Sequence, residues 1–206
     1  MWKPISGLSL ALALVPMGAQ KADAARAQDA ERSDAWKIEN ALSAGPKVIA
    51  DHATVMDWPA AEGQKMRVLR EGTNGWMCMP GRTWEPRPDP MCVDKTMMKW
   101  MMAKLAHRKP DIDRIGLAYM LQGEVRADPN NFHAHAPPLG KDWIYVGPHI
   151  MVVLPDASTT GALRGQNHDV STGEPYVAAW SSSSPILVIP IAKGDEEIVV
   201  EKITHE

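Results

Sequence analysis

The stretch DPMCVDKTMMKWMMAKLAHRKP, residues 89–110, carries the strongest secondary-structure signal in the chain. Asp89-Pro90 is typical of the start of a helix, and Pro110 is typical of its end. At a spacing of 100° per residue, the apolar side chains share one broad arc made of Met91, Met97, Met98, Met101, Met102 and Leu105. Lys95 and Lys99 fall on the opposite side. The pattern predicts an amphipathic helix that packs against another part of the protein.

Short runs rich in β-branched residues lie on both sides of this helix. Gly, Pro, Ser and Asn separate them, which is typical of strands joined by turns. A first helix is expected over 34–44, where Gly45-Pro46 ends it. Strands are expected at 53–58, 65–70, 76–79, 115–122, 143–154 with a break at Gly147-Pro148, 176–180, 186–192 and 197–203. Two helices among many strands predict an α+β fold with a mostly antiparallel sheet.

The first 27 residues have the three-part organisation of a secretory signal peptide. Lys3 gives a positive start, the run from Ile5 to Met17 is apolar, and small residues follow it. A buried N-terminal helix is the alternative, but Pro16 and the polar stretch after it argue against that. The sequence therefore predicts a signal peptide at 1–27, a single domain over 28–206, and a periplasmic or secreted protein.

Composition excludes several classes of function. The chain has 206 residues and a formal net charge of −3, with no basic block, which argues against binding to nucleic acid. No apolar run reaches the 18 or so residues that a membrane span needs, so no span is expected in the mature chain. The large side chains are unusual, since 13 Met and 8 Trp stand against one Phe and three Tyr.

The two cysteines, Cys78 and Cys92, are expected to form a disulfide bond. An even pair in an exported chain is oxidised by default, and a stiff, proline-rich segment separates the two residues. The alternative is a nucleophilic or metal-binding thiol. Neither cysteine has a CxxC partner, and two distant thiols supply too few ligands for a zinc site.

Several segments together resemble a family of uncharacterised exported bacterial proteins. They are ENALSAGPKVIADHATVMDWP (39–59), GTNGWMCMP (72–80), DPMCVDKTMMKWM (89–101), IGLAYMLQG (115–123), VGPHIMVVLP (146–155) and EPYVAAW (174–180). The resemblance covers most of the mature chain. It implies a secreted single-domain protein and brings no catalytic residues with it.

A histidine pair is the first candidate for metal binding. His133 and His135 lie in a polar loop, and an H-x-H pair in an extended segment presents both rings to one side. Such a pair suits Zn²⁺ or Cu²⁺ if the fold adds a third ligand, for which Asp128, His149 and His168 are candidates. The alternatives are a solvated loop without metal and, for His149, a buried histidine of the core.

Sulfur ligands are the second candidate for metal binding. Met77 and Met79 bracket Cys78, and thioethers suit Cu(I). Methionines at helical spacing are more often core residues, because their unbranched side chains fill irregular gaps.

Other functions have weaker signals. No hydrolase motif occurs, although His149 with Asp94 could form an acid/base pair of a hydrolase-like enzyme. Trp76 and Trp84 flank the disulfide loop and could bind sugars or peptides, or could belong to the core. The leading hypothesis is a binding or interaction module for a small ligand, a metal such as copper or zinc, or an envelope protein. The alternative hypothesis is the hydrolase-like enzyme that uses His149.

Overall fold

The computed structural model describes residues 33–60, 63–82, 85–128, 131–156, 158, 173–178 and 184–191, together with the backbone of 202–203. The described residues from Asp34 onward belong to one compact unit. The expected signal peptide at 1–27 lies outside the described residues and stays a prediction. Within the described part of the chain, no helix is long and apolar enough to cross a membrane.

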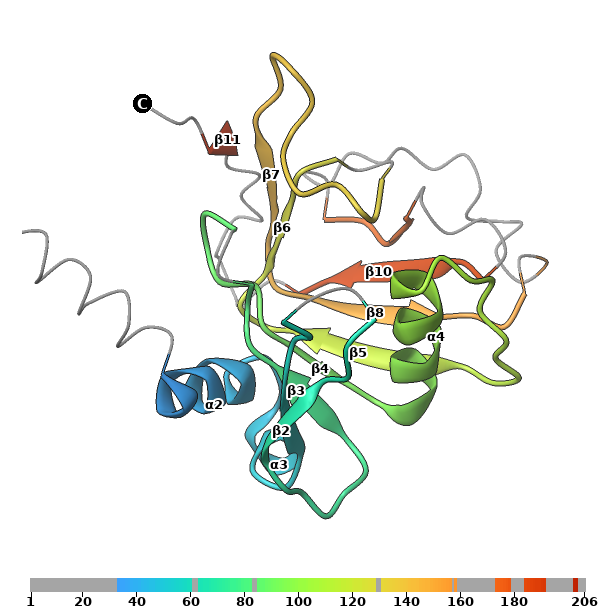
Figure 1. Ribbon diagram of the computed structural model, residues 1–206. Coiled ribbons are helices and arrows are strands. Elements are labelled where there is room, and N and C mark those ends of the chain that lie inside the picture. The colour runs from blue at the N-terminus through green and yellow to red at the C-terminus, as the bar shows by residue number, and fades with distance from the viewer. Residues whose placement is uncertain are drawn as a thin grey trace, which may run out of the picture. The chain divides into compact units, whose positions relative to one another are not determined.

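Three helices and eleven strands are present in the described residues (Figure 1). The helices are α2 (Asp34–Leu42), α3 (Lys47–Ala50) and α4 (Lys95–Leu105). The strands are β1 (Thr54–Asp57), β2 (Arg67–Arg70), β3 (Met77–Met79), β4 (Met91–Val93), β5 (Gly116–Met120), β6 (Glu124–Arg126), β7 (Trp143–Val146), β8 (His149–Val153), β9 (Tyr176–Val177), β10 (Ile186–Pro190) and β11 (Lys202–Ile203).

The main sheet has eight strands in the order β2-β1-β3-β4-β5-β8-β10-β9. All neighbouring pairs in it are antiparallel except β1 and β3, which run parallel. A second sheet has the order β11-β7-β6. The predicted α+β fold with a mostly antiparallel sheet is confirmed. The four-residue helix α3 and the strand β6 are additions that the sequence did not predict.

The predicted start of the main helix at Asp89-Pro90 is wrong. Residues 91–93 form strand β4, in which Cys92 lies opposite Cys78 of β3. Helix α4 begins at Lys95, and its N-cap is Asp94, whose Oδ1 accepts a hydrogen bond from the Met97 N–H at 2.7 Å. Strand pairing with β3 and β5 therefore outweighs the local preference of Pro90 for the first turn of a helix.

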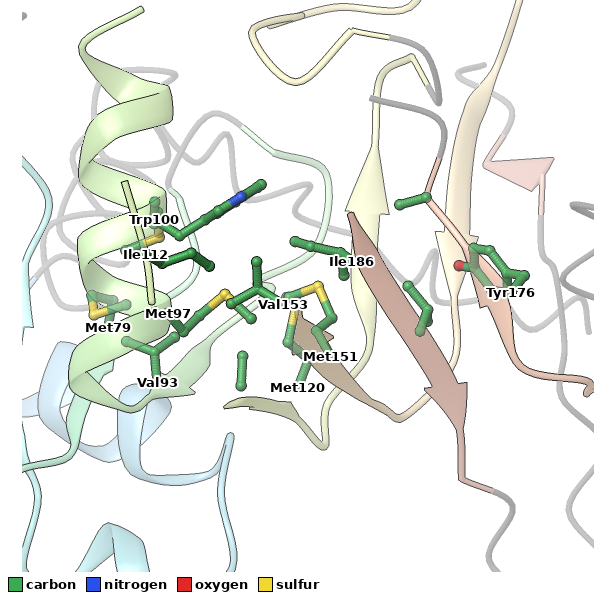
Figure 2. Close-up of a cluster of buried hydrophobic side chains, with 14 residues drawn as sticks. Met79, Val93, Met97, Trp100, Ile112, Met120, Met151, Val153, Tyr176 and Ile186 are labelled. Carbon is green, nitrogen blue, oxygen red and sulfur yellow. The ribbon is translucent and has the colours of Figure 1, made fainter. Parts of the chain in front are cut away.

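The two faces of the main sheet bury different side chains, as alternation along a strand requires. On one face, α4 covers a core rich in methionine, which includes Val93 of β4 and Met151 of β8 (Figure 2). On the other face, α2 packs over Cys92 and over small residues such as Ala41. The face under α4 holds the larger side chains.

The predicted disulfide bond is present between Cys78 and Cys92. Both residues are fully buried, and they are directly opposed in the antiparallel pair of β3 and β4. Gly45 passes so close that a Cβ there would lie 3.1 Å from the Cys92 Sγ. The bond therefore fixes the two ends of the 13-residue segment between the cysteines inside the smaller core.

Strand β5 leads through a short turn into β6, and β7 leads through Gly147-Pro148 into β8, so the main sheet is joined to the second sheet, to which β6 and β7 belong (Figure 1). The turn between β5 and β6 contains Gly123, with φ of +83°, where a Cβ would lie 2.6 Å from the Tyr145 hydroxyl. Only glycine fits this conformation and this close approach. The turn brings β6 to the end of β8 that begins with His149.

Candidate functional site

A cavity of about 1240 Å³ lies under α4, and we call it the α4 cavity. Side chains from α4, β4, β6, β8 and β10 line it, together with the loops at 80–89 and 131–135. Its volume is somewhat larger than the roughly 300–1,000 Å³ that is common for small-molecule sites, so a small organic molecule has room to bind there. Two parts of the lining differ in character, an apolar wall and a polar end, and other charged residues such as Lys37, Asp57 and Arg108 line the cavity elsewhere.

The apolar wall consists mainly of side chains from the inner face of α4 and from the sheet below it. They are Met91, Met97, Trp100, Met101, Met102, Leu105, Met151 and Ile186. Several of them lie between α4 and the strands in Figure 2. The Trp100 indole N–H donates to the Ser184 carbonyl at 3.2 Å, so the polar atom of this ring is satisfied within the protein. Unbranched methionines give the wall a surface that adapts to ligands of different shape.

The polar end consists of five charged residues from the loop at 80–89 and from β6. They are Arg82, Glu85, Asp89, Glu124 and Arg126. Charged side chains are rarely buried unless they are paired, and here they face one another in a confined space. The polar end therefore combines both signs of charge beside the apolar wall.

Residues 80–82 are held in place by contacts with α2 and with Trp58. The Gly81 N–H donates to the Asn40 Oδ1 of α2 at 2.8 Å, and the Trp58 indole N–H donates to the Pro80 carbonyl at 2.6 Å. The Arg82 guanidinium stacks on the Trp58 ring, 4.3 Å from its centroid. These contacts direct Arg82 toward Glu85, whose Oε1 it contacts at 3.3 Å.

Glu85 and Asp89 form a buried pair of carboxyl groups. The Glu85 side chain is only 2% exposed, and Asp89 is 4% exposed. Burial raises the pKa of Asp89 well above its ordinary value, and a hydrogen bond with Glu85 and the charges of Glu85 and Glu124 raise it further, against the opposing charge of Arg82. Asp89 therefore keeps its proton to a higher pH than an ordinary aspartate does.

Glu124 and Arg126 form the second pair of the polar end. Their side chains project from the same side of β6, and the Glu124 Oε2 lies 2.7 Å from the Arg126 guanidinium. Burial would raise the pKa of Glu124, but the charge and hydrogen bond of Arg126, with smaller contributions from His149 and Arg82, hold it below its ordinary value. Glu124 is therefore ionised at neutral pH.

His149, a predicted site residue, lies behind this pair and is fully buried. Its Nδ1 lies 2.7 Å from the Gly147 carbonyl, to which it donates, and its Nε2 lies 3.6 Å from the Glu124 Oε2. Burial lowers the pKa of His149, and although Glu124 and the Gly147 carbonyl oppose this effect, the ring is neutral at pH 7. This burial agrees with the alternative of a core histidine.

The structure does not bring Asp94 to His149. The Asp94 carboxylate caps α4 and also accepts a hydrogen bond from the Leu117 N–H at 3.0 Å. Leu117 pairs with Val152, whereas His149 begins β8 opposite Met120. Three strand positions separate the two places by about 10 Å.

The predicted metal ligands of the histidine loop lie at the edge of the α4 cavity. His133 and His135 both line it, and the His133 ring stacks on the His107 ring with centroids 4.1 Å apart. Asp128 also lines the cavity, whereas His168 lies outside the described residues. Among the residues that the structure describes, no three His, Cys, Asp or Glu side chains could hold a metal ion together.

The remaining predicted candidates lie away from the cavity. Met79 is fully buried under α4 and Met77 is partly buried, and neither lines the cavity. Trp76 packs against the smaller core, where its ring lies 5.4 Å from the Tyr119 ring. Trp84 lies outside the described residues.

Sequence reasoning missed the whole polar end. Arg82, Glu85 and Asp89 lie in a proline-rich segment that reads as a solvated loop, and Glu124 and Arg126 follow a turn. The one usable signal is the spacing of Glu124 and Arg126, since opposite charges at i and i+2 share one face of a strand. Comparison with protein-family models, with curated proteins and with solved structures gives no match for this chain.

Proposed function

We propose that this is an exported, non-enzymatic protein that binds a small amphipathic organic molecule in the α4 cavity. The observation that carries the proposal is the division of one large cavity into an apolar wall of methionine, tryptophan and leucine and a polar end of buried charges. An amphipathic molecule would bury its apolar part under α4 and direct its polar group toward Glu85 and Arg126. Ligand sites commonly combine an apolar lining with a few fixed polar groups in this way.

Export is part of the proposal. The Cys78–Cys92 disulfide supports it, because such bonds persist in oxidising compartments. Mass spectrometry of the protein from a secreting host should find a chain that has lost about the first 27 residues, as signal peptides are removed. An intact N-terminus would contradict export.

The hydrolase-like alternative has less support. His149 has no exposed surface and does not line the cavity, so a substrate in the cavity would not touch its ring. Zinc or copper binding at His133 and His135 is not included in the proposal, because the described residues offer no third ligand there.

The binding function can be tested with N-phenyl-1-naphthylamine, an uncharged dye whose fluorescence increases in apolar surroundings. Met102 lines the cavity, and Met102→Glu should place a charge in the apolar wall and weaken dye binding about tenfold or more, since a buried charge is costly. Met98 is a matched control, because it lies on α4, is also half-buried, and does not line the cavity.

Met98→Glu should leave dye binding within about twofold of the unmodified protein, which corresponds to less than about 0.5 kcal/mol. Equal weakening by both variants would place the bound dye elsewhere on the protein. No binding of the dye to the unmodified protein would also count against the proposal.

A further inference from the structure

Four side-chain rings that line the α4 cavity form a continuous row. They belong to Trp100 of α4, to Phe132 and His133 of the loop at 131–135, and to His107 just beyond the end of α4. Trp100 and Phe132 meet edge to face with their centroids 5.9 Å apart, and Phe132 meets His133 in the same way at 5.3 Å. His133 in turn stacks on His107. We call these four residues the ring row, and the only phenylalanine of the chain lies within it.

The last ring of the row is held at a cost in backbone strain. With φ of +52°, His107 adopts the left-handed conformation, which favours glycine and strains a residue with a side chain. The His107 N–H donates to the Lys104 carbonyl at 2.9 Å, and the Arg108 N–H donates to the Ala103 carbonyl at 2.8 Å. These are the bonds of a Schellman motif, in which glycine is the commonest residue at the position of His107. A glycine would end α4 with less strain but would remove this ring, and strained residues of this kind cluster at ligand sites.

The methionines of the cavity give a second reason to expect an aromatic ligand. Five thioethers line it from α4 and from the sheet, namely those of Met91, Met97, Met101, Met102 and Met151. Sulfur makes favourable contacts with aromatic rings, and rings attract one another edge to face, in both cases beyond the effect of burial alone. A saturated ligand of the same size would gain only the effect of burial.

We infer that the ligand of the α4 cavity carries a flat aromatic ring system, which binds against the ring row and the methionine thioethers. Saturated rings and alkyl chains of equal size bind more weakly. This inference rests on the proposed binding function and names the chemical class of its ligand. It concerns the apolar part of the ligand and does not depend on the charges of the polar end.

Two matched compounds test this inference. The probes are 2-naphthol and decahydro-2-naphthol, which share their fused-ring skeleton and their hydroxyl group and differ in aromaticity. Calorimetry at pH 7 should show that 2-naphthol binds about tenfold more tightly, a difference of about 1.4 kcal/mol, because only its rings interact favourably with the ring row and with sulfur.

Two variants should reduce this preference. Phe132→Leu removes a ring from the middle of the row, and the double variant Met101→Leu/Met102→Leu removes two thioethers with little change in volume. Each should lower the preference to about threefold or less and leave the affinity for decahydro-2-naphthol within about twofold of its original value. Met98→Leu is the control, because Met98 lies on α4 and does not line the cavity, and it should keep the full preference.

The readout is the ratio of the two affinities, because a merely structural disturbance of the cavity would weaken the binding of both compounds alike. The inference is overturned if the two compounds bind equally well to the unmodified protein, or if either cavity variant keeps the full preference for 2-naphthol. Equal binding of both compounds would leave the proposed function standing. If neither the dye nor either naphthol compound binds, both proposals fail.

Discussion

Asp89 and His149 show at the scale of single residues how burial reverses ordinary expectations about charge. An aspartate and a histidine at neutral pH are usually assigned from their ordinary pKa values. Here burial raises the pKa of Asp89 and lowers the pKa of His149, so both groups favour their uncharged forms. Two titratable groups with shifted pKa values therefore lie within one cluster of charges.

The raised pKa of Asp89 makes stability depend on pH in a defined direction. The folded protein keeps the Asp89 proton at pH values above 3.8, the ordinary pKa of this carboxyl group. The stabilisation of the folded protein by this proton is therefore complete below pH 3.8, and it is lost as the pH rises through the pKa of Asp89 in the folded protein. Asp89→Asn keeps the uncharged form at every pH. Urea unfolding should show the stability of the variant rising relative to the unmodified protein as pH increases from 4 toward 8.

The control for this prediction is Asp111→Asn, which replaces an exposed carboxylate outside the cavity. Its stability relative to the unmodified protein should change little over the same range of pH. If the difference in free energy of unfolding between Asp89→Asn and the unmodified protein did not vary with pH, the pKa of Asp89 would not be raised in the folded state.

Helix α4 is the element on which the cavity depends, and Asp94 anchors its start. One carboxylate oxygen accepts from Met97 N–H at 2.7 Å and the other accepts from Leu117 N–H at 3.0 Å, which ties the helix to β5. Gly116 allows this approach, because a Cβ there would lie 2.5 Å from the Met97 nitrogen. Asp94 is thus a structural residue at the junction of α4 and β5.

Asp94→Ala should lower the free energy of unfolding by about 2 kcal/mol, because it removes the helix cap and leaves the Leu117 N–H without its acceptor. Asp94→Asn retains one acceptor oxygen and should cost less than Asp94→Ala. Urea unfolding monitored by circular dichroism measures both. Equal stability of Asp94→Ala and the unmodified protein would contradict this role.

At the scale of elements, sequence reasoning succeeded where a pattern is long and local. The methionine arc predicted α4, and turn residues separated most strands correctly. Sequence reasoning failed at 89–94. Pro90 favours the start of a helix there, but Cys92 pairs with Cys78 and Val93 pairs with Ala118, and these pairings require a strand. Those partners are distant in sequence, so no local signal reports them.

At the scale of the whole molecule, the methionine excess has two roles that sequence alone cannot separate. Met79 and Met120 are fully buried in the core, whereas Met91 and Met102 line the cavity. Both groups carry the same apolar pattern, because a cavity wall and a packed core are equally shielded from water. The polar end could not be predicted either, because only the folded chain brings Arg82, Glu85 and Asp89 to the same cavity as β6.

The most direct test of the binding claim is NMR of the protein labelled with ¹³C at its methionine methyl groups, titrated with N-phenyl-1-naphthylamine. Five methionines line the α4 cavity, namely Met91, Met97, Met101, Met102 and Met151. Met77, Met79 and Met98 pack near α4 or the sheet but do not line the cavity. The account predicts that the aromatic dye shifts the resonances of the lining methionines and leaves those three nearly unchanged. Shifts confined to Met77, Met79 and Met98, or no shifts at saturating dye, would contradict it.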